Sequence, residues 1–223
     1  MKLLEKQLWH FLSLALLLLG IYVTLKIDKE ILFGSLWNVK TKAWFLWAVS
    51  IPIVHQVYVL ICWRSELYYN SLTKIIGKHA FKIYLIDFFI LFAIRIVFLI
   101  FLANSNRYTF NLNNYVKSVL IFIISVISIY AFYSVKRYFG FKRAAGLDHF
   151  DVEVRKLPLV KKGIFKYTRN GMYTYAFLAF YLPGLFYESK AAILVALFSH
   201  IYIWVHYYFT EKPDMNYIYQ NKY

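Results

Sequence analysis

The chain has 223 residues, of which 61% are hydrophobic, and 26 Lys and Arg against 11 Asp and Glu give it a formal net charge of +15. A soluble domain is nearer half apolar, so this composition is typical of a membrane protein. The charges lie between apolar segments, where they set topology and meet anionic lipid, which argues against nucleic acid as a partner. The single cysteine, Cys62, excludes an intrachain disulfide and a structural zinc site of several thiolates.

Six apolar segments follow one another along the chain. At 1.5 Å per residue, about 20 residues cross a hydrocarbon core of about 30 Å. The fifth segment has only 16 residues and contains Pro183 and Gly184, so we expect it to cross incompletely or to lean on its neighbour. The residues after the first leucine core are too bulky for a signal-peptide cleavage site, which favours a retained helix. The segments are 8–25, 43–63, 83–103, 115–134, 172–187 and 191–209.

These segments predict an all-α fold, a polytopic integral membrane helical bundle of about six transmembrane helices that ends in a C-terminal helical hairpin. We divide the chain into N-terminal transmembrane helices, residues 1–134, and a loop, hairpin and tail, residues 135–223. Six spans place both termini on one side, where the loops and ends hold eighteen Lys and Arg against six on the other side. By the positive-inside rule, the loop 135–170 and the C-terminus are expected to face the cytoplasm.

Two polar stretches flank the predicted hairpin. Residues 163–173 read GIFKYTRNGMY, and residues 210–223 read TEKPDMNYIYQNKY. If the last two apolar segments are antiparallel helices, the two stretches meet on one side of the membrane and form a single site at its surface.

The first stretch resembles the pattern G-x-Y-x-x-x-R-H-P-x-Y of the membrane methyltransferases, the superfamily of isoprenylcysteine carboxyl methyltransferase and phospholipid N-methyltransferase. The tail is similar to that family's terminal pattern, E-E-x-x-L followed by an aromatic residue, a glycine and a tyrosine. The positions that match are Arg169, Tyr173, Glu211, Met215, Tyr219 and Tyr223. The positions that depart are Asn170 for histidine, Gly171 for proline, Lys212 for the second glutamate and Gln220 for glycine.

The resemblance implies S-adenosylmethionine as the cofactor and a binding role for Arg169, Asn170, Tyr173 and Glu211. It also implies a lipid-borne or hydrophobic acceptor that reaches the site from the bilayer. The chemistry of the residues agrees, since a guanidinium at a helix start can hold a carboxylate and a glutamate can accept from an ammonium group. Tyr167, Tyr173 and Tyr219 are candidates to pack on adenine. The alternative is that Arg169 marks topology and the tyrosines form an interfacial belt.

Asp148, His149 and Asp151 lie within four residues, ahead of the first motif. Methyl transfer from a sulfonium is an in-line displacement that needs a positioned, deprotonated acceptor, and a histidine can take a proton near neutral pH. These three residues are therefore the candidate catalytic group, and the alternative is a loop turn in which Asp148 caps a short helix. No metal is predicted, because the spacing of His149, Asp151, His200 and His206 fits no familiar pattern.

Asp87 and Arg95 lie inside the third apolar segment, where ionisable groups are costly and usually paired or functional. They are two turns apart, so each could instead bond a neighbouring helix, and Arg95 could neutralise an acidic headgroup or line an access path. Two other function classes remain open: an NADPH-dependent membrane reductase of the sterol type, and a non-catalytic channel or assembly factor.

Overall fold

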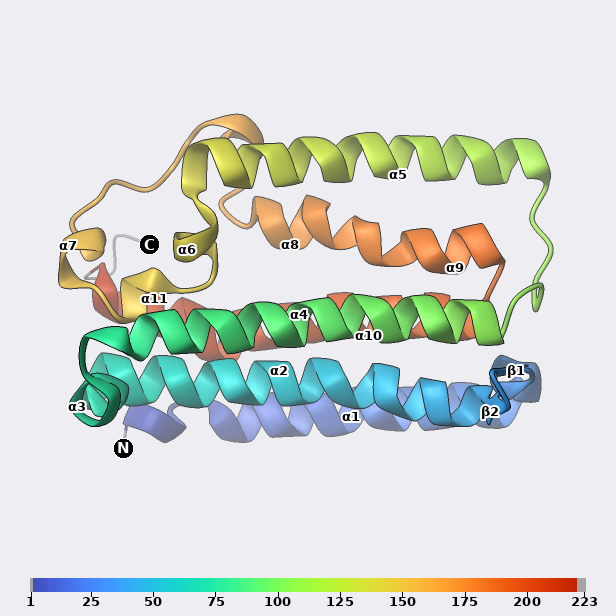
Figure 1. The fold of residues 1–223 in the computed structure, drawn as a ribbon, viewed down its shortest axis with the longest axis horizontal. Coiled ribbons are helices and arrows are strands. Elements are labelled where there is room, and N and C mark those ends of the chain that lie inside the picture. Colours follow the sequence, from blue (N-terminus) through green and yellow to red (C-terminus); the bar gives the residue numbers. More distant parts are fainter. Residues whose placement is uncertain (1, 220–223) are drawn as a thin grey trace.

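The fold was analysed in a computed structural model that describes residues 2–219. Its long helices lie side by side along one axis (Figure 1), and its two short strands, β1 (Ser35–Leu36) and β2 (Val39–Lys40), form an antiparallel hairpin. Within the described part, five helical segments are long and apolar enough to cross a membrane, which confirms an all-α polytopic membrane bundle. These segments contain α1 (Gln7–Ile27), α2 (Thr41–Tyr69), α4 (Ala80–Ser105), α5 (Asn114–Ser134) and α10 (Lys190–His206).

The fifth predicted helix is helical but not regular. It consists of α8 (Gly171–Tyr175), a 3-10 stretch (Ala176–Phe180) and α9 (Tyr181–Tyr187), and it packs against α5, α4 and α10. The irregular stretch lies just before Pro183, whose ring has no N–H for the carbonyl of Ala179 and would clash with it in a regular helix. The predicted interruption is thus present, one turn earlier than the proline itself.

The short elements gather at the two ends of the bundle. In Figure 1 the first turn (Lys2–Leu4), α3 (Ser71–Ile76), α6 (Phe141–Ala144), α7 (Val152–Arg155) and α11 (Lys212–Ile218) lie at one end, and the β hairpin lies at the other. The loop after α5 and the tail after α10 therefore meet, as the hairpin prediction requires. Further short turns are Lys29–Leu32, Gly77–His79, Leu147–His149 and Gly163–Lys166.

Helices from both halves of the sequence share one apolar core. Leu14 of α1, Trp44 of α2, Leu99 of α4 and Tyr202 of α10 are all buried in the same cluster. Polar pairs add specific contacts between helices, since the Tyr58 hydroxyl of α2 donates to Asp87 of α4 at 3.0 Å. Asp87 is therefore an interhelical partner and does not pair with Arg95.

Candidate active site

A pocket opens at the end of the bundle where the loop and the tail meet, and we name it the rim pocket. It has a volume of about 710 Å³, including the part that opens to the surroundings. Seven of the nine predicted site residues line it, which are Asp148, His149, Arg169, Asn170, Tyr173, Glu211 and Tyr219. Its other walls include Trp63, Phe139, Arg143, Leu159, Val160, Phe165 and Met215.

The two remaining predicted residues lie elsewhere. Tyr167 is 71% exposed and does not line the pocket. Asp151 is the N-cap of α7, where its carboxylate accepts from the backbone N–H of Glu153 at 2.8 Å. The helix-capping alternative thus describes the loop correctly, although the cap is Asp151 rather than Asp148. Gln220 and Tyr223, which belong to the tail pattern, lie outside the described residues.

A direct hydrogen bond joins the two motifs. The Tyr173 hydroxyl, from the first turns of the hairpin, donates to the Glu211 carboxylate at its end. Glu211 is the last residue of a π-helical turn, Tyr207–Glu211, that connects α10 to α11. The turn widens because Pro213 offers no N–H to the carbonyl of Phe209 and its ring excludes a regular turn. Pro213 thereby helps to direct Glu211 into the pocket.

Arg64 fills the gap that this wide turn leaves. Its guanidinium donates to the freed carbonyl of Phe209 at 3.2 Å and to the carbonyls of Leu3, in the first turn, and Glu5, just after it, at 2.9 and 2.8 Å. Arg64 is one of the eighteen Lys and Arg that hydropathy assigns to the loops and ends of one side, but α2 extends to Tyr69 and the Arg64 side chain is fully buried. A buried guanidinium needs partners for its donors, and the carbonyls and a carboxylate supply them.

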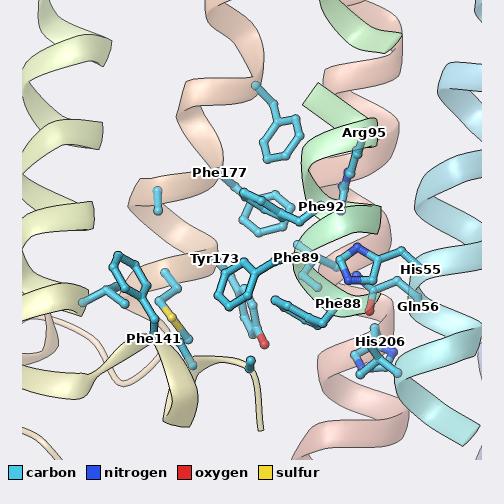
Figure 2. A pocket seen from close by; sticks show the side chains of 18 of the residues that line it. His55, Gln56, Phe88, Phe89, Phe92, Arg95, Phe141, Tyr173, Phe177 and His206 are labelled. Atoms are coloured by element: carbon cyan, nitrogen blue, oxygen red, sulfur yellow. The ribbon is translucent and has the colours of Figure 1, made fainter. Parts of the chain in front are cut away.

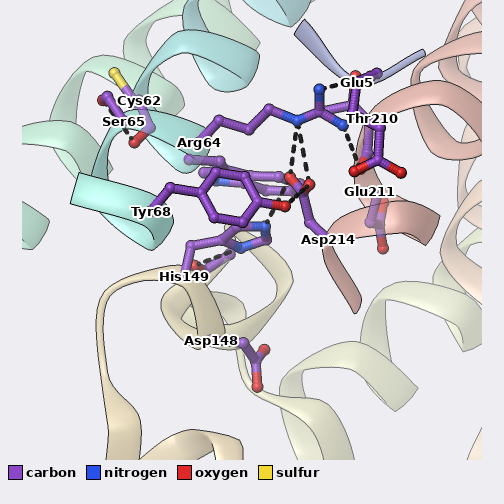
Figure 3. A network of polar contacts seen from close by, with 12 residues as sticks. Glu5, Cys62, Arg64, Ser65, Tyr68, Asp148, His149, Thr210, Glu211 and Asp214 are labelled. Atoms are coloured by element: carbon purple, nitrogen blue, oxygen red, sulfur yellow. Dashed lines mark hydrogen bonds and ion pairs between the residues drawn. The ribbon is translucent and has the colours of Figure 1, made fainter. Parts of the chain in front are cut away.

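The carboxylate partner is Asp214 of α11, and around it lies the polar network of Figure 3. Arg64 Nε lies 3.1 Å from Asp214 Oδ1, with both side chains fully buried. The Tyr68 hydroxyl donates to the same oxygen at 3.1 Å. These contacts fix α11 against α2. They thereby also constrain Glu211, which lies about one helical turn before Asp214 in the chain.

His149 lies between this network and the pocket. Its ring stacks on Trp63 with centroids 4.1 Å apart, its Nδ1 is 3.3 Å from the Gly146 carbonyl, and its Nε2 is 3.6 Å from Asp214 Oδ2. Gly146 has a φ of +92°, and a Cβ there would lie 2.3 Å from Trp63, so only glycine fits this turn. The loop is thereby pressed onto α2, and the role of His149 as a base stays a prediction.

Asp148 belongs to a second polar group that lines the rim pocket. Its Oδ1 accepts from Arg143 Nε at 3.2 Å and from the Tyr219 hydroxyl at 2.6 Å. Arg143 Nη2 also donates to that hydroxyl at 2.9 Å. Burial raises the pKa of Tyr219 to about 12, so the phenol stays protonated and keeps donating. Sequence reasoning missed Arg143 as a site residue; its spacing of five from Asp148 was the available signal.

Arg169 and Asn170 form the outer edge of the pocket. Arg169 is exposed, and α8 begins right after Asn170, as expected, but it is a helix of only five residues. A helix this short has only a small dipole, so its N-terminus contributes little to binding an anion. The Arg169 guanidinium therefore supplies most of the positive charge at this edge of the pocket. Gly171 is packed so closely that a Cβ would lie 2.8 Å from Ile164.

A second cavity, which we name the bundle cavity, lies deeper between the helices (Figure 2). Its volume is about 890 Å³, including open parts, and most of its lining is apolar, with Phe88, Phe89 and Phe92 on α4 and Phe132 on α5. Trp63, Ala144, Met172 and Tyr173 line both this cavity and the rim pocket. The two spaces therefore meet at these four side chains, which we name the junction.

The fold and the site define a multi-span membrane protein with a polar pocket at one end of the bundle and an apolar cavity behind it. The family model described as phospholipid methyltransferase matches residues 113–222. This match over the C-terminal part of the chain is consistent with the membrane methyltransferase superfamily that the two motifs indicated. No curated protein and no solved structure gives a significant match.

Proposed function

We propose that this protein transfers a methyl group from S-adenosylmethionine to a lipid-borne or hydrophobic acceptor. The observation that carries the proposal is the junction, where a polar pocket and an apolar cavity meet at Trp63, Ala144, Met172 and Tyr173. Transfer of a methyl group from a water-soluble donor to an apolar acceptor requires the two molecules to approach in line, and contact between a polar and an apolar space allows that approach.

The residues of the rim pocket fit the donor. S-adenosylmethionine supplies an electrophilic methyl group on a sulfonium, beside an amino acid end and an adenine. Arg169 is suited to the carboxylate of that amino acid end and Glu211 to its ammonium group. Leu159, Val160, Phe139 and Phe165 offer apolar walls for the adenine. Tyr173 positions Glu211 by donating to its carboxylate.

The bundle cavity suits the acceptor. Its phenylalanine-rich walls match an apolar chain, and α4 and α5 both contribute to it, so an acceptor already dissolved in the bilayer could enter from the side. We infer that the loop 135–170 and the tail face the cytoplasm, where the donor is found. The rim pocket lies at the end of the bundle that carries most of the Lys and Arg, in agreement with that orientation.

The test uses detergent-purified protein and calorimetric titration with S-adenosylmethionine and, separately, NADPH. We expect the protein to bind S-adenosylmethionine and not NADPH. When membrane lipids are then added, we expect the labelled methyl group of S-adenosylmethionine to appear in an organic-soluble product. Binding of NADPH without S-adenosylmethionine would overturn the proposal in favour of a reductase. Binding of neither compound would favour a non-catalytic protein.

A further inference from the structure

Arg95 is a buried charge halfway along a membrane helix. It is 3% exposed and lies fifteen residues past Ala80, the first residue of α4. At 1.5 Å per residue this spacing places Arg95 about 22 Å along a helix of 26 residues that is about 39 Å long, so it lies near the middle of the helix and inside a hydrocarbon core about 30 Å thick. A cation at this depth is costly, so it is normally paired or functional.

Arg95 has no anionic partner among the described residues. Asp87, the acidic residue of the same helix, bonds to Tyr58 instead. The guanidinium lies over the rings of Phe180 and Phe177, at 4.6 and 5.3 Å from their centroids. Its Nη2 has a long contact of 3.5 Å with the Ser199 carbonyl, and its Nε has no hydrogen-bond partner. Aromatic faces attract a cation but do not neutralise it.

Unsatisfied hydrogen-bonding groups accompany Arg95 along the same cavity. His55 of α2 is 2% exposed and His206 of α10 is 1% exposed, and neither ring nitrogen of either residue has a hydrogen-bond partner within the described chain. Figure 2 shows Arg95, His55, Gln56 and His206 on one side of the bundle cavity, with Phe141 across from them. Buried donors are nearly always satisfied, so several open ones lining one space indicate a ligand.

We propose that the deep half of the bundle cavity binds an oxyanion carried by an otherwise apolar molecule, with Arg95 as its counter-ion and His55 as a further donor. A carboxylate and a phosphate monoester share this chemistry. His55 lies eight residues before Trp63 on α2, which places the oxyanion about 12 Å deeper than the junction. If this molecule is the methyl acceptor, a point that rests on the proposed function, its charged group lies about 12 Å from the methylated atom.

The test is a direct binding assay that needs no methyl transfer. Purified protein in a nonionic detergent is titrated with cis-parinaric acid, a fluorescent fatty acid that accepts energy from protein tryptophans. Hexadecanoate, hexadecyl phosphate and hexadecanol then compete for the site. At least one anion is expected to displace the probe at a concentration roughly tenfold or more below that of hexadecanol, because a charge-assisted hydrogen bond discriminates by about that factor. The better competitor identifies carboxylate or phosphate as the recognised group.

Variants assign the effect to Arg95. Arg95→Met is expected to weaken binding of the preferred anion by about 10- to 100-fold and to leave hexadecanol almost unchanged. Arg95→Lys is expected to recover part of the loss, since it keeps the charge. Asp87→Asn is the matched control, because it neutralises an ionisable residue of the same helix that does not line the cavity.

Two results would overturn the proposal: equal competition by both anions and hexadecanol in the wild type, or unchanged anion binding in folded Arg95→Met. The wild-type comparison decides the matter even if that variant does not fold. Titration of S-adenosylmethionine is measured separately. Selective anion binding in a protein that does not bind S-adenosylmethionine would contradict the proposed function and leave this site standing.

Discussion

At the scale of single residues, the rim pocket places opposite charges on separate elements. Arg169 lies at the exposed start of the hairpin, and Glu211 lies at its end, bonded to Tyr173. This separation matches a zwitterion, whose two charges need two partners. The pocket remains partly open to water at Arg169, so each contact should contribute a moderate amount of binding free energy.

We expect Arg169→Ala to weaken S-adenosylmethionine binding by about 10- to 150-fold, the value of a charge-assisted hydrogen bond of roughly 1.5–3 kcal/mol. Arg169→Lys should recover little, because a point charge does not replace the bidentate fork. Glu211→Gln keeps the shape and one acceptor and should be milder. Calorimetric titration measures these affinities, and gel filtration confirms folding. Equal affinity in all three variants would contradict this placement of the donor.

His149 is the candidate base. Because its side chain is fully buried, a substitution can disturb packing as well as proton transfer, and the test must separate the two effects. If it takes a proton from the acceptor, His149→Gln should slow methyl transfer at saturating substrate by roughly 10²- to 10⁴-fold while the cofactor affinity stays almost unchanged. The pH dependence of the rate should also flatten, which a purely structural role would not produce. A variant with normal turnover and an unaltered pH profile would assign His149 to packing between Trp63 and Asp214.

At the scale of elements, the join between α10 and α11 controls the geometry of the tail. Pro213 prevents a regular turn, and the released carbonyl of Phe209 is bonded by Arg64 and by Gln7 at 2.9 Å. Three segments far apart in sequence, the first turn, α2 and the tail, are held by this one arrangement.

Replacing Pro213 by alanine should let residue 213 bond the Phe209 carbonyl, tighten the turn and rotate Glu211 away from Tyr173. We therefore expect Pro213→Ala to weaken S-adenosylmethionine binding by about tenfold, comparable to loss of a single contact. Pro183→Ala is the matched control, since this proline lies in α9 and lines neither cavity. Both affinities come from the same titration, and equal effects of the two changes would contradict a specific role for the wide turn.

The Arg64–Asp214 pair should also govern stability. Arg64→Met leaves the Asp214 carboxylate buried without its cation, which typically costs about 3–5 kcal/mol. The double variant Arg64→Met, Asp214→Leu should recover part of that loss, because no unpaired charge remains. Unfolding in a graded series of denaturing detergent measures the difference. If the double variant is no more stable than Arg64→Met, the carbonyl contacts of Arg64 dominate over the ion pair.

At the scale of the whole molecule, the site is assembled at one end of the bundle. The first turn, the loop after α5 and α11 all lie there (Figure 1). A topology reporter fused after Tyr223 and one inserted near Lys156 should therefore both report cytoplasm, and one near Asn111 should report the opposite side. A tail reporter on the opposite side from the one near Lys156 would contradict the shared site.

The sequence alone determined the class of fold and the ends of the candidate site. Long apolar segments can be read locally, because each must satisfy its backbone hydrogen bonds within itself in lipid. The motifs at 163–173 and 210–223 gave the pocket residues Arg169, Tyr173 and Glu211, because an antiparallel hairpin brings its two ends together. Hydropathy alone does not predict the irregular stretch between α8 and α9. The signal for it in the sequence is Pro183, which lies inside an otherwise apolar segment.

Only the tertiary structure decided which polar groups act together. Arg64 and Asp214 are 150 positions apart, and no local pattern pairs them. Asp151 likewise caps a helix in the tertiary structure, and Arg143 pairs with Asp148. Trp63 lines both the rim pocket and the bundle cavity, which no pattern along the chain indicates. The physical reason is that hydropathy and short motifs depend on neighbours along the chain, whereas ion pairs and cavities depend on which helices pack side by side.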